Sequence, residues 1–167
     1  MLTDETRSDL TAESARRRMT PPARSPEQRK RDTLDRLEHD VDAWVATAGD
    51  GGPYMTPLSF LWDGHRLLLS TADATPTARN LLDGGTVRLG LGLTRDVVLI
   101  HGTVTAQPAA TIPGDIGDAF AVKTGFDPRV SRGPYTYFWV TPVLVQAWRE
   151  VNELAGRDLM LDGKWTV

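Results

Sequence analysis

Five short apolar segments follow one another between residues 43 and 106, and residues that favour turns, or in one case a short predicted helix, separate each from the next. The segments are AWVATA, YMTPLSFLW, RLLLST, TVRLGLGL and DVVLIHGTVTA. Two of the connections, GDGGP (49–53) and DGH (63–65), contain glycine, which adopts the positive φ that tight turns require. Short strands joined by such turns predict a mainly β domain in the form of a closed or partly closed barrel.

The C-terminal third predicts the remaining strands. YTYFWV and VLVQAWR are typical of one last strand or a strand pair, and Pro142 between them predicts an edge, a bulge or a bend. Together with the first five segments, these strands predict a barrel of six to seven strands with short turns and few helices.

A helix is expected to precede the strands. Ser25 is its predicted N-cap, Pro26 its first residue and Gln28 the capping-box partner of Ser25. The helix should end near Asp40. Three apolar residues fall on one face of this helix: Leu34, Leu37 and Val41.

Two further helices are expected between strands. One covers about residues 76–83 and ends at Gly84-Gly85. The other covers about 115–124 and ends at Gly125, after a linker rich in proline and alanine at 106–114. Residues 1–24 are polar and rich in arginine and acids, which predicts a disordered tail before one domain at 25–167.

Composition excludes several classes of function. The net charge of −3 does not favour nucleic acid or an anionic membrane as partner. The chain has no cysteine, which excludes disulfides and thiolate chemistry and fits a cytoplasmic protein. No apolar run is long enough to span a bilayer, and the N-terminus lacks the apolar core of a secretory signal. We therefore expect a cytoplasmic protein that contacts neither nucleic acid nor membrane.

The segment LSTADATPTARNL places hydroxyls and a cation where a strand leads into a helix. Thr75 is the predicted N-cap, and the exposed N–H groups of a helix start attract anions. The residues that would surround an anion there are Ser70, Thr71, Thr77, Arg79 and Asn80. The alternative is an ordinary cap, with Arg79 in water.

Pro57 lies inside the second predicted strand. Because proline cannot donate to a strand ladder, the sheet should be open there, and the backbone of Leu58 and Ser59 can then face a planar polar ligand. A simple edge or bulge is the alternative. The three histidines lie far apart in different elements, so no metal site is expected.

Five tryptophans are many for this length: Trp44, Trp62, Trp139, Trp148 and Trp165. They are expected in the core and in a dimer contact. A second interpretation is a wall beside a flat cofactor, for which Trp148 is the best candidate.

The order of these segments resembles the flavin-binding split β-barrel family, which includes pyridoxamine 5′-phosphate oxidase and the flavin/deazaflavin oxidoreductases. The similarity covers about residues 30–167 and is carried by WVATAGDGGPYMTPLSFLWDG, LLLSTADATPTARNL, VRLGLG and DVVLIHGTVTA. It implies an FMN-binding homodimer with two flavin sites at the subunit interface. The cofactor-binding positions that it implies, together with the cap, are Met55, Pro57, Leu58, Ser59, Ser70, Thr71, Thr75, Thr77, Arg79, Asn80 and Trp148.

The resemblance also assigns parts of the cofactor. The backbone of residues 55–59 would lie along the isoalloxazine ring, Ser70 and Thr71 would face the ribityl phosphate, and Thr77, Arg79 and Asn80 would hold the phosphate side. Trp148, with Arg157, would approach from the partner subunit or the C-terminal edge.

Two departures from the family pattern matter. Many members carry lysine where this chain has Thr77. Arg79 cannot replace it directly, because two helical residues rotate a side chain by roughly 200°. The chain also lacks the Arg-Leu-x-Pro ending of true pyridoxamine-phosphate oxidases, so pyridoxamine phosphate is not the expected substrate.

The resemblance therefore predicts an FMN-dependent oxidoreductase acting on an unknown small substrate. An alternative is a reductase that uses the deazaflavin coenzyme F420 in the same place, with Arg88, Arg95 and Arg129 as candidate partners for its acidic tail. A non-catalytic flavin- or haem-binding module and a structural dimer without ligand are alternatives from other classes.

Overall fold

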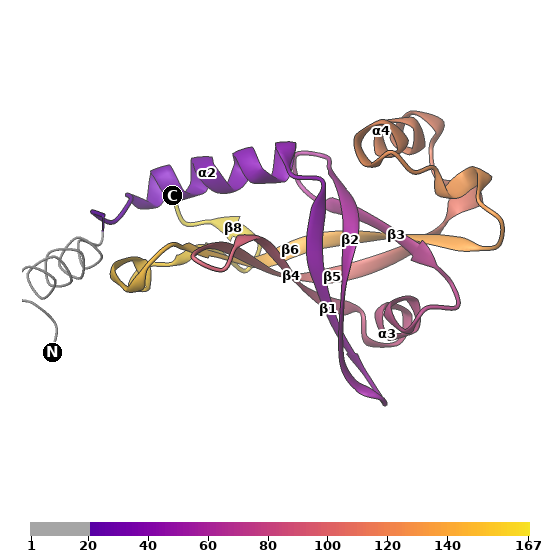
Figure 1. Cartoon of the computed structure of the whole chain (residues 1–167), viewed down its shortest axis with the longest axis horizontal. Coiled ribbons are helices and arrows are strands. Elements are labelled where there is room, and N and C mark those ends of the chain that lie inside the picture. The colour runs from indigo at the N-terminus through magenta and orange to yellow at the C-terminus, as the bar shows by residue number, and fades with distance from the viewer. Residues whose placement is uncertain (1–20) are drawn as a thin grey trace, which may run out of the picture.

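The strands of the computed structural model, which describes residues 21–167, form a closed barrel with a short extension (Figure 1). The sheet order is β3-β2-β1-β4-β5-β6-β7-β8, and an additional pairing of β3 with β6 closes the first six strands into a ring. The strands are β1 (Asp42–Gly49), β2 (Gly52–Trp62), β3 (Leu67–Ala72), β4 (Thr86–Leu93), β5 (Asp96–Pro108), β6 (Tyr135–Trp148), β7 (Asp158–Leu161) and β8 (Lys164–Trp165). The predicted barrel of six to seven strands is confirmed: six strands close it, and β7 and β8 are additional to it.

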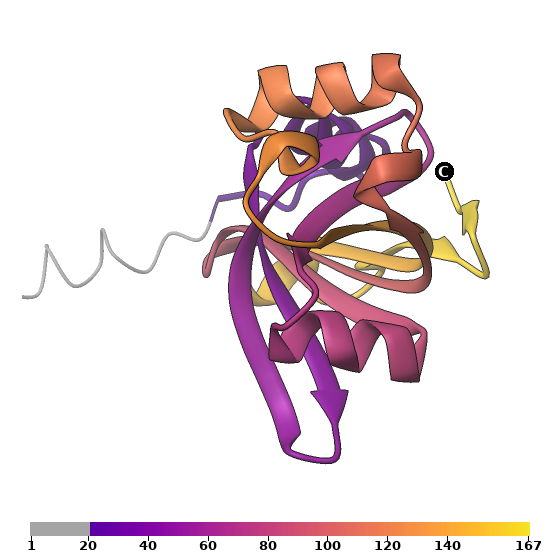
Figure 2. The same cartoon turned by 90° about the vertical axis from the view of Figure 1, so that its right-hand side faces the viewer.

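Helices cover the outside of this barrel (Figure 2). They are α2 (Pro26–His39), α3 (Pro76–Gly84) and α4 (Gly114–Thr124), with 3-10 turns η1 (Ala109–Thr111), η2 (Pro128–Val130) and η3 (Val151–Glu153). In Figure 2, α4 and α3 lie on opposite sides of the strands. Within residues 21–167, no helix combines the length and apolar character needed to cross a membrane.

The helix ends follow the predicted local signals. Ser25 Oγ accepts the Gln28 N–H at 3.2 Å, and Gly85 and Gly125 close α3 and α4 with φ of 62° and 72°. The capping box is only half formed, because the Gln28 side chain bonds to Asp32. The linker predicted at 106–114 is instead the end of β5, the turn η1 and the first residue of α4.

The prediction for Val41 was wrong. The helix ends at His39, and Asp40 is extended with φ −66° and ψ 142°. The helical repeat therefore stops before Val41, which is 38% exposed, whereas Leu37 is buried.

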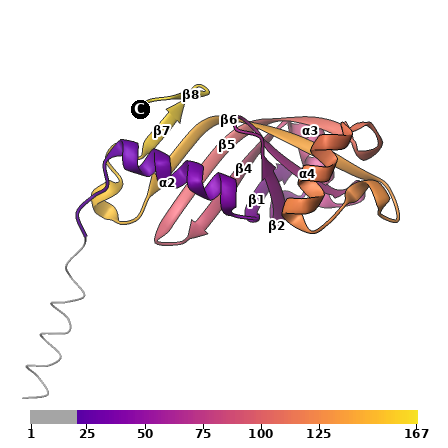
Figure 3. The same ribbon diagram turned by 90° about the horizontal axis from the view of Figure 1, so that it is seen from above.

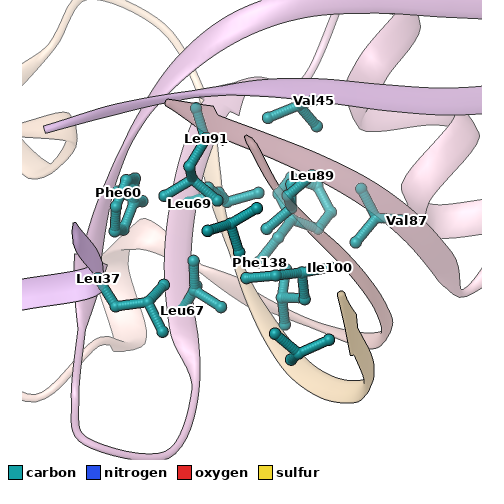
Figure 4. Close-up of a cluster of buried hydrophobic side chains, with 14 of the residues drawn as sticks. Leu37, Val45, Phe60, Leu67, Leu69, Val87, Leu89, Leu91, Ile100 and Phe138 are labelled. Carbon is teal, nitrogen blue, oxygen red and sulfur yellow. The ribbon is translucent and has the colours of Figure 1, made fainter. Parts of the chain in front are cut away.

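The core fills the inside of the barrel, because alternate residues of each strand point inward (Figure 4). A second, smaller cluster lies between the sheet and α4. There the ring of Phe120 meets that of Tyr137 edge to face, with centroids 5.2 Å apart. The labelled members of the main cluster are Leu37, Val45, Phe60, Leu67, Leu69, Val87, Leu89, Leu91, Ile100 and Phe138.

The barrel is split between β2 and β3. β2 pairs with β1 along residues 52–59, and Trp44 lies opposite Pro57. β3 pairs with β2 only at Phe60–Trp62 of β2, while its residues Leu67–Ala72 all pair with β6. The edge of β2 that faces β3 is therefore unpaired before Phe60, which confirms the opening predicted from Pro57.

Pro142 lies within one continuous strand, β6. Gly102 pairs with Pro142 and His101 pairs with Leu144, so Val143 is the extra residue of a bulge. Of the three alternatives predicted for Pro142, the structure shows the bulge.

The start of α2 lies beside the end of β6 and the turn that follows it (Figure 3), and charged residues join these segments. Arg24 donates to Glu153 through its backbone N–H at 2.9 Å and through Nη2 at 2.7 Å, and the N–H of Arg149 donates to the same carboxylate at 2.8 Å. Arg24 also bonds to Asp32 at 2.7 Å. The hydrogen bonds from Arg24 hold the pKa of the buried Glu153 at about 2. Most of the tail predicted at 1–24 lies outside the described residues; residues 21–24 include Arg24 of this cluster.

Candidate functional site

The split between β2 and β3 is a groove of about 450 Å³. We call it the β2–β3 groove. β2 and β3 contribute half of its lining residues, and the others come from Asp42, Thr75, α4, Phe126 and the start of β6. Its lining residues are Asp42, Pro57, Leu58, Ser59, Ser70, Thr71, Ala72, Thr75, Phe120, Thr124, Phe126 and Tyr135.

Part of the predicted site lies together in this groove. The positions that share it, from two strands and the start of α3, are Pro57, Leu58, Ser59, Ser70, Thr71 and Thr75. They come together because β2 and β3 diverge before Phe60, so that residues 57–59 face residues 70–72 across open space.

Hydrogen bonds within the first turn of α3 determine how many N–H groups are free to bind an anion. Thr75 Oγ1 accepts the Ala78 N–H at 3.1 Å and is hydrogen-bonded to Thr71 Oγ1, also at 3.1 Å. The Arg79 N–H donates to the Thr75 carbonyl, and Pro76 has no N–H. Within this chain the helix start is therefore an ordinary cap, with few donors left for an anion.

Thr77 and Arg79 lie on different sides of α3, as the helical rotation predicts. Thr77 is 1% exposed, and its buried Oγ1 has no hydrogen-bond partner within the described part of the chain. Arg79 is exposed, and its Nη1 donates to the Ala74 carbonyl at 2.8 Å. Neither residue lines the β2–β3 groove.

Arg79 and Asn80 line a second hollow of about 380 Å³, between α3 and the β1–β2 turn. Asn80 Nδ2 donates to Thr47 Oγ1 at 3.0 Å. A Cβ on Gly49 would lie 2.1 Å from Asn80 Oδ1, so the glycine permits this close approach. Asp50 and Asp83 also line this hollow, so Arg79 shares it with two carboxylates.

Met55 and Trp148 also lie outside the β2–β3 groove of this chain. Met55 is 62% exposed on β2. Trp148 is at the opposite end of β6 from Tyr135, and the Arg157 guanidinium lies 5.4 Å from its ring centroid. Any contact of these two residues with a ligand in a groove therefore needs a second subunit or a ligand that extends beyond the groove.

Sequence reasoning missed one wall of the groove. Phe120, Phe126 and Tyr135 make it aromatic, and the rings of Phe126 and Tyr135 are 5.4 Å apart. Asp42 is the sole charged side chain among the lining residues, and its Oδ1 accepts a hydrogen bond from the Ser59 hydroxyl at 2.6 Å. The helix at 115–124 was predicted, but its sequence carries no signal of the surface that it covers.

Lys123 holds this wall in place. Its Nζ donates to the Leu37 carbonyl at 3.0 Å and lies 4.6 Å from the ring centroid of Phe60. Burial lowers the pKa of Lys123. The bond links the end of α4 to the end of α2, where a cation is favoured by the helix dipole.

Metal binding has no support in the described residues, where no three His, Cys, Asp or Glu side chains gather. The groove offers hydroxyls, an open strand edge and aromatic rings. A flat organic molecule is the kind of ligand that such a set of groups suits, because the strand edge and the hydroxyls are polar and the aromatic rings are apolar.

A comparison with known protein families identifies the family of this chain. The model of the family described as pyridoxamine 5′-phosphate oxidase matches residues 33–149. No curated protein sequence matches. An F420 reductase structure is 18% identical, with a TM-score of 0.56 over 66% of this chain and 93% of that one.

Two other solved structures have the same fold. A putative pyridoxamine 5′-phosphate oxidase from Listeria innocua is 13% identical, with a TM-score of 0.58 over 74% of this chain and 98% of that one. General Stress Protein 26 from Bacillus anthracis is 12% identical, with a TM-score of 0.53 over 71% of this chain and 92% of that one.

Proposed function

Since this chain belongs to the pyridoxamine 5′-phosphate oxidase family, we propose that it is a flavin-binding oxidoreductase that holds the ring of FMN in the β2–β3 groove. The observation that carries the proposal is the unpaired edge of β2 at Pro57–Ser59, which faces Ser70–Ala72 across the groove. This edge is where the sequence resemblance puts the ring.

The residues of the groove fit a flat heterocycle. The volume of the groove, about 450 Å³, is within the range of small-molecule sites. A strand edge offers backbone N–H and C=O groups in its own plane, and the polar rim of a ring can bond to them. Leu58 and Phe126 supply apolar surface for the ring faces.

The groove offers few groups that could bind the phosphate of FMN. Ser70, Thr71 and Thr75 bring hydroxyls to the groove, but no Lys or Arg lines it. Charge-assisted bonds are about twice as strong as neutral ones. We therefore expect weaker FMN binding here than in family members with lysine at the position of Thr77.

A bound flavin supplies the hydride or electron transfer, and the protein positions the reactants and excludes water. Asp42 and the aromatic wall favour a small aromatic substrate that is neutral or cationic. A phosphorylated substrate would meet a carboxylate and no cation in the groove, so we propose that pyridoxamine 5′-phosphate is not the substrate.

We propose that the active form is a homodimer. Trp44 and Met55 are 53% and 62% exposed on the neighbouring strands β1 and β2. Large apolar residues exposed together are typical of interaction surfaces. In a dimer, Trp148 and Arg157 of one subunit can complete the groove of the other.

The deazaflavin F420 is the second candidate cofactor, supported by the fold shared with an F420 reductase. Two of the arginines considered for its acidic tail are engaged: Arg95 pairs with Glu150 at 3.0 Å, and Arg129 with Asp118 at 2.7 Å. Arg88 forms no salt bridge with another residue in the range 21–167. Dissociation constants measured for both cofactors decide between them.

The test is a titration followed by flavin fluorescence, in wild type and in Ala72→Trp, which places an indole in the groove. Thr105→Trp is the control, because it puts the same side chain at an exposed position of β5. We expect Ala72→Trp to weaken binding at least tenfold and Thr105→Trp to bind like wild type. Equal affinity of all three proteins, or a wild type that binds neither flavin nor deazaflavin, contradicts the proposal. Binding without turnover would favour a non-catalytic module.

A further inference from the structure

A separate pocket of about 250 Å³ lies on the outside of the barrel, across β1, β4 and β5. We call it the Arg88 pocket. It shares no lining residue with the β2–β3 groove. Its lining residues are Ala46, Thr47, Ala48, Thr86, Val87, Arg88 and His101.

The pairing of the strands brings the cation and the imidazole of this pocket together. Arg88 on β4 is the direct partner of His101 on β5, and on its other side it pairs with Ala46 on β1. Directly opposite residues have Cβ atoms about 5 Å apart, and both residues line the same pocket.

Within the described residues, the Arg88 guanidinium has no salt bridge and His101 Nδ1 has no hydrogen bond. Arg88 is exposed and enters no salt bridge in residues 21–167, whereas Arg95 and Arg129 both pair with carboxylates. His101 Nδ1 is buried and has no hydrogen-bond partner in the same part of the structure.

No carboxylate lines the pocket to balance Arg88. The strand neighbours of the pair are also uncharged: Leu144 lies opposite His101 on β6, and Thr103 lies opposite Thr86. The pocket therefore combines a cation, an imidazole and the hydroxyl of Thr86 without a negative charge. This set of donors binds oxygen anions.

The location of the pocket strengthens this conclusion. Ala46 follows Trp44 on the same side of β1, and Trp44 is 53% exposed. A second copy that covered this apolar surface would also cover Arg88. A buried cation without a counter-charge is strongly destabilising, so an anion held between Arg88 and His101 would remove that penalty.

We propose that the Arg88 pocket is an anion site that binds a phosphate or carboxylate group through Arg88, His101 and Thr86. The anion is either free inorganic phosphate or the phosphate of a flavin held by a second copy. The second source rests on the proposed function; the first does not.

The experiment compares Arg88→Gln with Arg95→Gln, because each removes one exposed positive charge from a strand or its adjoining turn. Binding of inorganic phosphate is measured by calorimetry, and circular dichroism checks the fold of both variants. FMN and riboflavin, which differ only by the phosphate, are titrated in parallel into the full-length protein.

We expect Arg88→Gln to weaken phosphate binding or FMN binding about tenfold while Arg95→Gln leaves both unchanged. A loss for inorganic phosphate alone identifies a free anion. A loss for FMN with unchanged riboflavin affinity identifies the cofactor phosphate. Equal affinities of wild type and both variants for phosphate and for FMN would overturn the site, even if riboflavin binding supports the groove. A wild type that binds neither phosphate nor FMN would overturn it as well.

Discussion

The buried carboxylate of Glu153 should carry a large, pH-dependent share of stability, and Glu153→Gln tests this. The side chain is 3% exposed and bonds to Arg24 and to the Arg149 N–H. Its pKa falls from an ordinary value of 4.5 to about 2. At about 1.4 kcal/mol for each pH unit, that difference corresponds to about 3 kcal/mol at neutral pH.

The sign of the pH dependence follows from the lowered pKa. A group whose pKa is lower in the folded state stabilises the fold above its unfolded value and loses this effect as the pH falls through the folded value. The contribution of Glu153 should therefore be complete above pH 4.5 and disappear as the pH approaches 2.

Urea unfolding of wild type and Glu153→Gln at several pH values measures this. We expect a loss of about 3 kcal/mol at pH 7 and a smaller difference at pH 3. Glu150→Gln is the control: its partner Arg95 is exposed, so removing the pair should cost less than about 1 kcal/mol. A Glu153→Gln effect below about 0.5 kcal/mol, or one independent of pH, would refute the reasoning.

Two further substitutions test the contacts around α3. Thr75→Val removes the cap on the Ala78 N–H and should cost about 1 kcal/mol, seen as a lower Tm, while Thr75→Ser should retain most of the stability. Gly49→Ala puts a Cβ where Asn80 Oδ1 lies and should break the bond of Asn80 to Thr47, at about 1 kcal/mol in urea unfolding. In an Asn80→Ala background, the same glycine substitution should be nearly neutral; an unchanged cost there would show that the clash is elsewhere.

The sequence predicts the barrel and most helix ends because their signals are local. Short apolar segments identify β1 to β6, and Ser25, Gly85 and Gly125 determine helix ends through local caps and backbone geometry. The short strands β7 and β8 have too few residues to show a periodic pattern.

The candidate site is predictable in part for the same reason. Pro57 predicts the open edge of β2, because proline cannot donate a hydrogen bond from its own strand. The aromatic wall depends on how α4 docks, and contacts between residues distant in sequence hold α4: Phe120 with Tyr137, and Lys123 with Leu37. Likewise, helical periodicity separates Thr77 from Arg79, but tertiary packing decides that Thr77 is the one that faces inward.

The central claim is that the split between β2 and β3 holds a flavin ring. Its most direct test is a titration of ¹⁵N-labelled protein with FMN, followed by amide chemical shifts. We expect the largest shifts at Leu58, Ser59, Thr71 and Ala72, and none at Thr105, which is exposed on β5. Saturable binding that shifts amides elsewhere and leaves these four unchanged would contradict the claim.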